Sequence, residues 1–292
     1  MFNEGIVLGF ITAVLWGISP LLYRWGGKDL SPVEINFVRN VGAFLSVIFI
    51  NLIIGAWNHL LVCLPLEIWV FFFLSLILGL FIGDNLFFKS MKLIGVGRST
   101  VVSSSYPIVT VIIASAFLKE KVSSKLFIAG LLVVLGVYLI YEDKNKIMDG
   151  FSSLKGYMVA VGAAFAWGLS LALVKVVSNY FTPLSFMTWR VGSLLIVTST
   201  FMLIKRRSLS SSLRELKVWI ILGAGGTIGI GVSYLAFVKA LQLAPVSQIG
   251  IITGMSPMLT TLFASLIYKE RISLRNGVGS VFVIAGGMLA SI

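Results

Sequence analysis

The sequence predicts an all-α integral membrane protein with ten transmembrane helices, arranged as two inverted five-helix repeats. Three observations support this fold class. Hydrophobic residues make up 58% of the 292 residues and charged residues only 12%, whereas a soluble domain is about 25% charged. The apolar residues form ten long runs, and the two halves of the chain carry the same uncommon residues in the same order.

The ten apolar runs have the length of membrane-spanning helices, which need about 20 apolar residues. They lie at 6–24, 33–55, 68–89, 98–118, 126–141, 156–176, 184–204, 217–239, 247–268 and 276–291. Glycine and charged residues separate them, as at Gly26–Asp29 and Lys205–Glu215. We therefore expect a first repeat at 1–143, a linker at 144–150 and a second repeat at 151–292.

The basic residues predict how the chain is oriented. Ten spans place both termini on one side, with five lysines in the connectors of that side and sixteen lysines and arginines in the opposite connectors. Basic residues collect in cytoplasmic loops, so we expect both termini outside the plasma membrane of a prokaryotic cell. The segment Met1–Gly5 has no lysine or arginine, so we expect the first helix to be retained and not cleaved as a signal peptide.

The composition argues against several classes of function. One cysteine, Cys63, and one histidine, His59, cannot supply the usual ligand set of a zinc or haem site, and we expect no cofactor. The net charge of +12 is best explained by cytoplasmic loops and not by nucleic-acid binding. An intramembrane enzyme would need clustered nucleophiles, bases or metal ligands, which such a sequence does not offer.

The chain is an internal duplication. A shift of 151 superposes Gly5, Ala13, Trp16, Gly17, Ser19, Pro32 and Arg39 on Gly156, Ala164, Trp167, Gly168, Ser170, Pro183 and Arg190. A shift of 150 superposes Lys89, Pro107, Thr110, Ala114, Ser115, Lys119, Glu120 and Ser123 on Lys239, Pro257, Thr260, Ala264, Ser265, Lys269, Glu270 and Ser273. Because five is odd, the second copy enters the membrane from the opposite face. Inverted halves of this kind are typical of carriers, which bind substrate near the midplane between them.

The repeated motifs resemble the paired EamA domains of the drug/metabolite transporter superfamily. The resemblance rests on a Trp-Gly in the first helix, an Arg early in the second, and a fourth helix with a central Pro and a closing Lys-Glu, and it covers nearly the whole chain. It implies a ten-helix basket in which the first four helices of each half line a central cavity, with the fifth and tenth helices at the periphery. It also implies transport of a small metabolite, often export of amino acids or related compounds. Homologous families move sugars or nucleotide-sugars.

Asp84 is the one acidic residue well inside an apolar run, and Asn85 follows it. A carboxylate inside the membrane is costly unless it is paired or hydrated. Asp84 is therefore a candidate for binding a proton or the substrate. The alternative is an ion pair with Lys89, with Lys92 or with an arginine of a neighbouring helix.

Arg39 and Arg190 are the two basic residues inside their spans, each seven residues after a proline. A guanidinium suits a carboxylate or phosphate, and inversion would place one arginine near each end of the cavity as an anion-attracting gate. The alternative is that each side chain extends to the lipid headgroups or to a carbonyl at a helix end.

Pro107 and Pro257 predict helix breaks in mid-span, because proline lacks an amide hydrogen. Polar side chains beside the breaks are candidates for binding substrate, or alternatively bond to their own backbone. The candidates there are Ser104, Tyr106 and Thr253. Trp16 and Trp167 are predicted either to stack on a ligand or to fill the seam between halves. Tyr234 aligns with Asp84 at the shift of 150, so the halves differ chemically there.

Small residues in the fifth and tenth spans predict close helix packing. The small-residue face of the tenth span, with Gly277, Gly286 and Gly287, suggests a homodimer through the fifth and tenth helices, although lipid could cover the same face. The expected partners are a small-molecule substrate and the lipid bilayer, and no nucleic acid. A channel is the alternative to a carrier, but the polar groups gather near the midplane and do not form a stripe through both leaflets.

Overall fold

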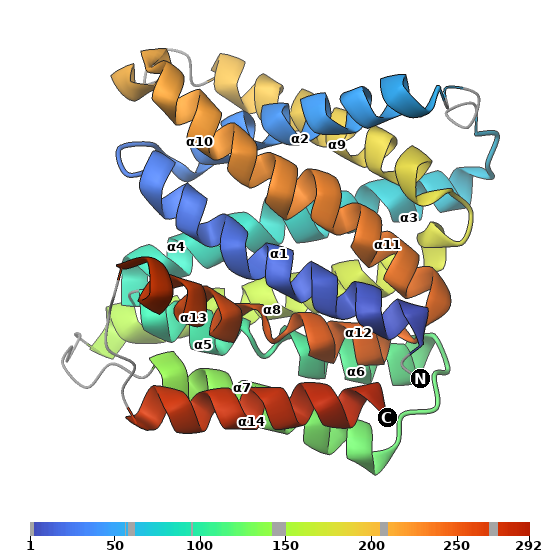
Figure 1. The fold of residues 1–292 in the computed structure, drawn as a ribbon, viewed down its shortest axis with the longest axis vertical. Helices are drawn as coiled ribbons and strands as arrows, with labels where there is room; N and C mark the ends of the chain where they lie inside the picture. Colours follow the sequence, from blue (N-terminus) through green and yellow to red (C-terminus); the bar gives the residue numbers. More distant parts are fainter. Residues whose placement is uncertain are drawn as a thin grey trace.

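The computed structural model describes residues 3–55, 57, 62–94, 96–141, 150–204, 210–268 and 274–292. His59, the second Lys-Glu motif at Lys269 and Glu270, and residues 144–149 of the expected linker lie outside these ranges. The described regular elements are all helical. In Figure 1 most of the helices run roughly side by side, and both termini lie at the same end of the bundle.

The first half contains five helical segments, of which the third and fourth are interrupted. They are α1 (Glu4–Gly26), α2 (Pro32–Ile54), the third segment α3 (Leu66–Leu76), η2 (Ile77–Gly83) and α4 (Asp84–Ile94), the fourth segment α5 (Val96–Ser103) and α6 (Tyr106–Phe117), and α7 (Ser124–Tyr141).

The second half repeats this order. It comprises α8 (Gly150–Ser178), α9 (Pro183–Ile204), a short 3₁₀ turn η4 (Ser211–Arg214), the third segment α10 (Leu216–Gly226), η5 (Thr227–Val232) and α11 (Ser233–Leu243), the fourth segment α12 (Val246–Thr253) and α13 (Ser256–Tyr268), and α14 (Leu274–Ser291).

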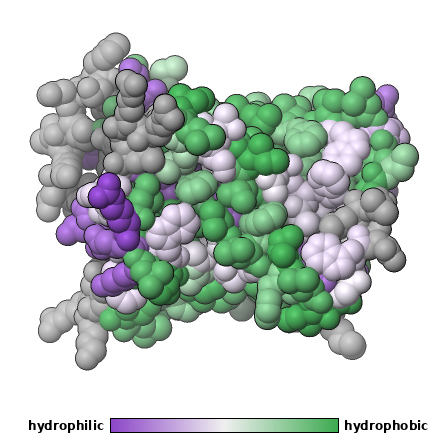
Figure 2. All heavy atoms as spheres, turned by 90° about the horizontal axis from the view of Figure 1, so that it is seen from above, coloured by the Kyte–Doolittle hydropathy of each residue, from purple (hydrophilic) through white to green (hydrophobic). Residues whose placement is uncertain are grey.

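These segments have the length and surface of membrane spans. In the described part of the chain, nine are long and apolar enough to cross a bilayer, and the apolar helix Ser124–Ile140 is shorter. Large apolar side chains such as Ile196 and Leu203 are 70% exposed, as expected for groups that face lipid. Figure 2 shows apolar side chains over the middle of one face and hydrophilic ones gathered at one end. The protein is a multi-pass membrane protein.

The third segment of each half contains a π-helical stretch that the sequence did not lead us to expect. η2 and η5 fall at equivalent places in the two halves. η2 ends directly before Asp84, and η5 ends two residues before Tyr234, the equivalent of Asp84. A π-helical stretch is often found at a functional site. Glycines mark both stretches: a Cβ on Gly79 would lie 2.4 Å from Ser170 Oγ, and one on Gly229 would lie 2.5 Å from Ser19 Cβ.

The first helix of each half packs against the third and fourth segments of the other half. A Cβ on Gly17 of α1 would lie 2.7 Å from Leu259 Cβ of α13. A Cβ on Gly168 of α8 would lie 2.7 Å from Val109 Cγ1 of α6. Gly17 and Gly168 are equivalent in the duplication, and so are their partners, Val109 and Leu259.

The same relation holds at the other end of these helices. A Cβ on Gly5 would lie 2.9 Å from Leu243 Cβ, and a Cβ on Gly156 would lie 3.0 Å from Leu93 Cβ. The shift of 150 superposes Leu93 on Leu243. The two halves therefore interlock through equivalent contacts, and the glycines allow the close approach.

The fifth and tenth segments, α7 and α14, pack against each other at one edge of the bundle (Figure 1). A Cβ on Gly136 would lie 2.5 Å from the Gly279 carbonyl oxygen, and one on Gly286 would lie 2.6 Å from that of Ala129. Of the small-residue face that suggested a homodimer, Gly286 and Gly287 pack within the chain, whereas a Cβ on Gly277 would meet no atom within 4 Å. A homodimer through the fifth and tenth helices stays a prediction.

Glu120, of the Lys-Glu motif that follows the fourth segment of the first half, caps a helix of the other half. Its carboxylate accepts hydrogen bonds from the backbone N–H groups of Val246, at 2.9 Å, and Ser247, at 3.2 Å. These groups begin α12, whose first amides have no partner within the helix. Lys119, with a φ of 54°, turns the chain so that Glu120 reaches the other half.

Candidate functional site

The fourth segments break where the two prolines lie. Ser104 and Ser105 separate α5 from α6, and Gly254 and Met255 separate α12 from α13. Proline clashes with the carbonyl four residues earlier and cannot donate to it. A Cβ on Gly254 would lie 2.7 Å from Pro107 Cγ, so the two breaks meet between the halves.

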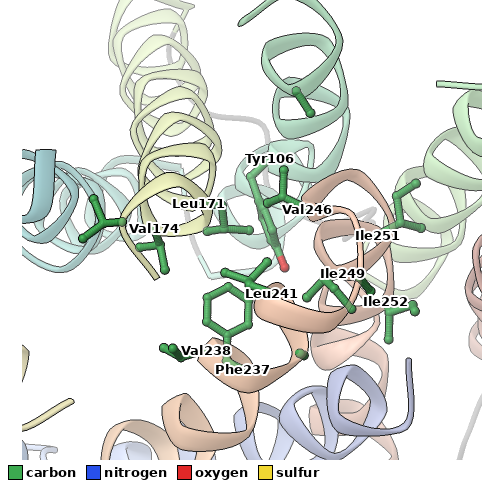
Figure 3. Packing of buried hydrophobic residues seen from close by; sticks show 14 of the residues in the cluster. Tyr106, Leu171, Val174, Phe237, Val238, Leu241, Val246, Ile249, Ile251 and Ile252 are labelled. Carbon is green, nitrogen blue, oxygen red and sulfur yellow. The ribbon is translucent and has the colours of Figure 1, made fainter. Parts of the chain in front are cut away.

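Tyr106 and Thr253 join the two breaks. The Tyr106 hydroxyl donates a hydrogen bond to Thr253 Oγ1 at 3.3 Å, and Thr253 Oγ1 donates to the Ile249 carbonyl at 2.8 Å. Figure 3 shows the Tyr106 ring among buried apolar side chains, including Leu241 and Ile249. Ser104 is buried beside them. Three of the predicted polar residues thus lie at the junction of the halves.

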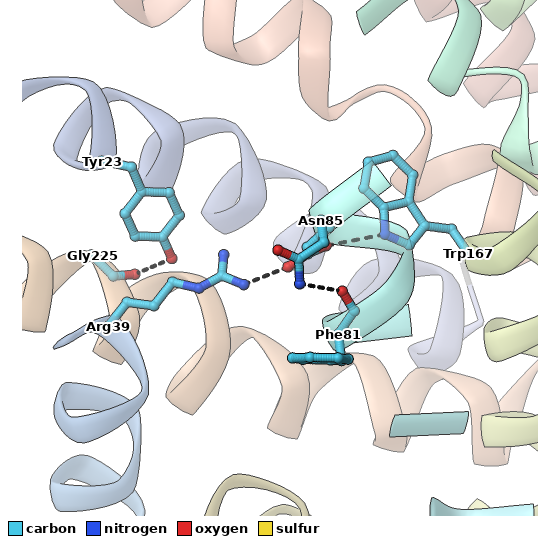
Figure 4. A network of polar contacts seen from close by, with 7 residues as sticks. Tyr23, Arg39, Phe81, Asn85, Trp167 and Gly225 are labelled. Carbon is cyan, nitrogen blue, oxygen red and sulfur yellow. Dashed lines mark hydrogen bonds and ion pairs between the residues drawn. The ribbon is translucent and has the colours of Figure 1, made fainter. Parts of the chain in front are cut away.

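Asp84 forms an ion pair with Arg39 of α2. The other carboxylate oxygen accepts a hydrogen bond from Trp167 Nε1 of α8 at 3.1 Å. Figure 4 shows Arg39 and Trp167 on opposite sides of Asn85, the residue that follows Asp84 in the chain. Of the partners considered from the sequence, an arginine of a neighbouring helix is therefore the one observed. Lys89 is exposed, and the side chain of Lys92 lies outside the described part.

Arg39 and Asn85 are held by further contacts visible in Figure 4. The Arg39 guanidinium lies 5.3 Å from the centre of the Tyr23 ring, and the Tyr23 hydroxyl donates to the Gly225 carbonyl at 3.0 Å. Asn85 Nδ2 donates to the Phe81 carbonyl at 2.7 Å, within its own segment. Asn85 therefore stabilises the junction of η2 and α4, next to Asp84.

Arg190 lies on α9 and has a different environment. Its Nη1 donates to Ser75 Oγ at 2.9 Å, and its guanidinium lies 5.5 Å from the ring centres of both Phe186 and Tyr234. Asp84 and Tyr234 lie close enough to interact electrostatically with both arginines. Arg39 and Arg190 thus share Asp84 and Tyr234 as electrostatic neighbours, and the placement of one arginine near each end of a cavity stays a prediction.

We call Arg39, Ser75, Asp84, Arg190 and Tyr234 the central cluster. It is almost closed to solvent, since the side chains of Arg39 and Asp84 are 8% and 13% exposed. Tryptophans lie on either side of it. Trp16 Nε1 donates to Ser233 Oγ at 3.0 Å, and its ring lies 5.4 Å from that of Tyr234. The Trp167 ring lies 5.3 Å from Phe87 and 6.0 Å from Tyr106.

Two buried residues of α2 were missed in the sequence. Asn36 and Asn40 are 4% and 1% exposed. Asn36 Oδ1 and both amide atoms of Asn40 have no hydrogen-bond partner among the described residues. A buried amide without a partner is costly, so these groups favour a bound polar molecule or water nearby. Both asparagines interrupt the apolar run 33–55, which was the available signal.

A groove of about 510 Å³ lies between α4 and α8, lined by Leu86, Leu154, Lys155, Met158, Val159 and Gly162. Leu154 and Met158 are among the exposed apolar side chains, so this groove faces the lipid. Within the described ranges, no group of three or more His, Cys, Asp or Glu residues is placed to hold a metal ion.

The comparison with protein families decides the class. The model of the EamA-like transporter family matches the chain twice, at residues 3–142 and 154–292. The chain belongs to this family. It is a membrane transporter of the drug/metabolite transporter superfamily and not an enzyme, as the repeated motifs implied.

Relatives along nearly the full length of the transporter carry the same general description. An uncharacterized transporter of Archaeoglobus fulgidus is 27% identical over 279 residues, which cover 96% of this chain and 94% of that protein. The uncharacterized inner membrane transporter YhbE of Escherichia coli K12 is 22% identical over 308 residues, covering 99% and 91%. A crystal structure with 17% sequence identity superposes with a TM-score of 0.83 and covers 98% of this chain and 96% of its own. That likeness supports the fold.

Proposed function

We propose that the protein is a secondary transporter that moves a small polar metabolite across the plasma membrane by alternating access. Amino acids or related compounds, moved outward, are the proposed cargo, as the resemblance implies. The moving parts are two inverted five-helix repeats, at 1–143 and 151–292, joined by a linker at 144–150. The relatives are described as uncharacterized transporters, without a cargo.

The observation that carries this proposal is the equivalence of the contacts between the halves. Gly17 and Gly168 each meet the equivalent residue of the opposite half, and so do Gly5 and Gly156. Such reciprocal contacts support a pseudo-two-fold relation between the halves. Halves related in this way can exchange conformations, which opens the binding site first to one side and then to the other.

The proposed substrate site lies where the central cluster and the broken helices meet. Its residues are Trp16, Arg39, Asp84, Asn85, Ser104, Tyr106, Trp167, Arg190, Tyr234 and Thr253. In the structure the Asp84 carboxylate forms an ion pair with Arg39 and accepts a hydrogen bond from Trp167. A proton or a cationic group of the substrate has to compete with Arg39 for Asp84, and this competition would couple binding to reopening of the site.

The orientation and the oligomeric state belong to the same proposal. The distribution of basic residues supports both termini outside the cell. A homodimer through α7 and α14 would use their outer faces, since Gly136, Gly279 and Gly286 pack between the two helices within the chain. Large apolar side chains cover those faces, among them Phe127, Ile128, Leu131, Leu135, Val281 and Met288.

Counterflow in reconstituted vesicles tests the proposal. Vesicles containing the purified protein are loaded with one unlabelled compound from a panel of amino acids, sugars and nucleosides, and uptake of the labelled compound is measured with and without a pH gradient. A carrier of amino acids gives saturable uptake that internal amino acid accelerates. Acceleration by sugars or nucleotide-sugars alone would support an exchanger of that type. Flux that rises linearly with concentration would indicate a channel.

A further inference from the structure

The central cluster holds two cationic side chains and one anionic side chain. Asp84 forms the ion pair with Arg39. Arg190 has no carboxylate partner among the described residues. Its side chain is 1% exposed and lies on a membrane-spanning helix. The structure therefore contains a buried positive charge that forms no ion pair with a described acidic group.

Neutral groups surround this charge. Ser75 contributes its hydroxyl and, at 3.4 Å, its carbonyl oxygen. The rings of Phe186 and Tyr234 contribute cation–π contacts at 5.5 Å. Arg190 Nε is buried and has no described partner. A guanidinium has five N–H donors in a planar fork, so donors remain free for a ligand.

Burying a charge in the membrane interior is costly unless an opposite charge accompanies it. The two arginines differ in this respect. Arg39 is paired with Asp84, whereas Arg190 lies in a pocket of aromatic rings and the hydroxyls of Ser75 and Tyr234 that would be completed by an anion. The planar guanidinium matches carboxylate and phosphate oxygens in bidentate geometry.

We infer that the central cluster binds a small oxoanion, a carboxylate or phosphate group of the transported molecule, and that Arg190 and not Arg39 is its principal ligand. This inference rests on the proposed function, because it gives the transported molecule a chemical class. The Tyr234 ring beside Arg190 and the Trp16 ring beside Tyr234 form one wall of the site.

The stability of the empty protein tests the charge argument. Arg39→Gln, Arg190→Gln and the exposed-charge control Lys89→Gln are compared by thermal unfolding of the full chain in detergent. Removing Arg39 leaves Asp84 buried and unpaired, so the midpoint should fall by several degrees. Removing Arg190 eliminates a buried charge that has no ion-pair partner, so the unfolding midpoint should stay equal to that of Lys89→Gln or rise. A fall as large as that of Arg39→Gln, or loss of the folded protein in Arg190→Gln, would overturn the inference.

Anion binding tests it directly. Acetate, inorganic phosphate and the neutral analogue acetamide are titrated against the same proteins, and the unfolding midpoint is followed. Acetate or phosphate should raise the midpoint saturably in the unsubstituted protein and in Lys89→Gln, with at least ten-fold weaker apparent affinity in Arg190→Gln. A response to acetate alone identifies a carboxylate site, and one to phosphate alone identifies a phosphate site. No saturable response, or an equal response to acetamide or in Arg190→Gln, would overturn the inference.

These measurements need no transport, so the two proposals can fail separately. Saturable anion binding at Arg190 without flux of any compound would remove the proposed function and leave the anion site. Counterflow of neutral compounds alone, without anion binding, would remove the anion site and leave the carrier.

Discussion

At the scale of single residues, the ion pair between Arg39 and Asp84 decides the chemistry of the protein's centre. Both side chains are largely buried, and breaking such a pair costs about 3–5 kcal/mol because one charge remains without a partner. Asp84→Asn and Arg39→Gln should each destabilise the protein by this order, and the double variant by less than the sum. Equilibrium unfolding in mixed micelles measures the free energy of unfolding of the unsubstituted protein, the two single variants and the double variant. Additive losses would contradict a direct pair.

Transport by Asp84→Asn tests the same residue in function. An amide cannot release or take up a proton, so uptake driven by a pH gradient should fall at least ten-fold, while counterflow without a gradient persists. Lys89→Gln, with an exposed charge removed on the same helix, should retain both activities. A pH-driven uptake in Asp84→Asn equal to that of the control would exclude Asp84 from proton coupling.

The sequence identified the residues of the central cluster better than it identified their partners. Asp84, Arg39 and Arg190 were evident because charged residues are rare in apolar runs. Which arginine pairs with Asp84 depends on how α2, α4 and α9 are placed, and no local pattern encodes that placement. Asn36 and Asn40 were overlooked because a polar residue in a span is informative only when its burial and missing partners are known.

At the scale of helices, the cap that Glu120 places on α12 joins the halves. The Glu120 carboxylate accepts hydrogen bonds from two backbone N–H groups and from the Ser247 hydroxyl, all in the other half. Glu120→Gln removes the charge that favours these bonds and should destabilise the protein by about 1–2 kcal/mol. Thermal unfolding compared with Glu67→Gln, at the start of α3, measures the effect. Equal midpoints for the two variants would show that the cap contributes no stability.

The interlocking glycines provide a second test at this scale. Gly17→Leu and Gly168→Leu each push a side chain into the opposite half and should cost about 1–3 kcal/mol or more. Gly162→Leu is the matched control, because its Cβ would meet only Leu86 Cδ1, at 3.4 Å. Similar losses at Gly17 and Gly168, with little loss at Gly162, are expected in thermal unfolding. A loss at only one of the two would contradict equivalent interfaces.

The helical elements differ in how far the sequence could predict them. The apolar runs predicted the helical segments and the prolines predicted where the fourth segments break, because segments and breaks have local physical causes. The π-helical stretches η2 and η5 were not predicted. Their glycines indicated close packing, and Gly79 and Gly229 do lie against Ser170 and Ser19 of neighbouring helices, but no local pattern encodes the extra residue per turn.

At the scale of the whole molecule, the central claim is that the two halves cross the membrane in opposite directions. The duplication predicts this from an odd number of segments, and the equivalent contacts between the halves support it. Ile54 and Ile204 end the second helix of each half, and both are well exposed, at 62% and 73%. If the halves are inverted, these two residues lie on opposite sides of the membrane.

Labelling of single cysteines in intact cells measures this most directly. The background carries Cys63→Ser, since Cys63 is exposed, and Ile54→Cys and Ile204→Cys are introduced separately. With a membrane-impermeant maleimide, Ile54→Cys should react from outside the cell and Ile204→Cys only after the membrane is opened. Reaction of both cysteines from the same side would contradict inverted halves.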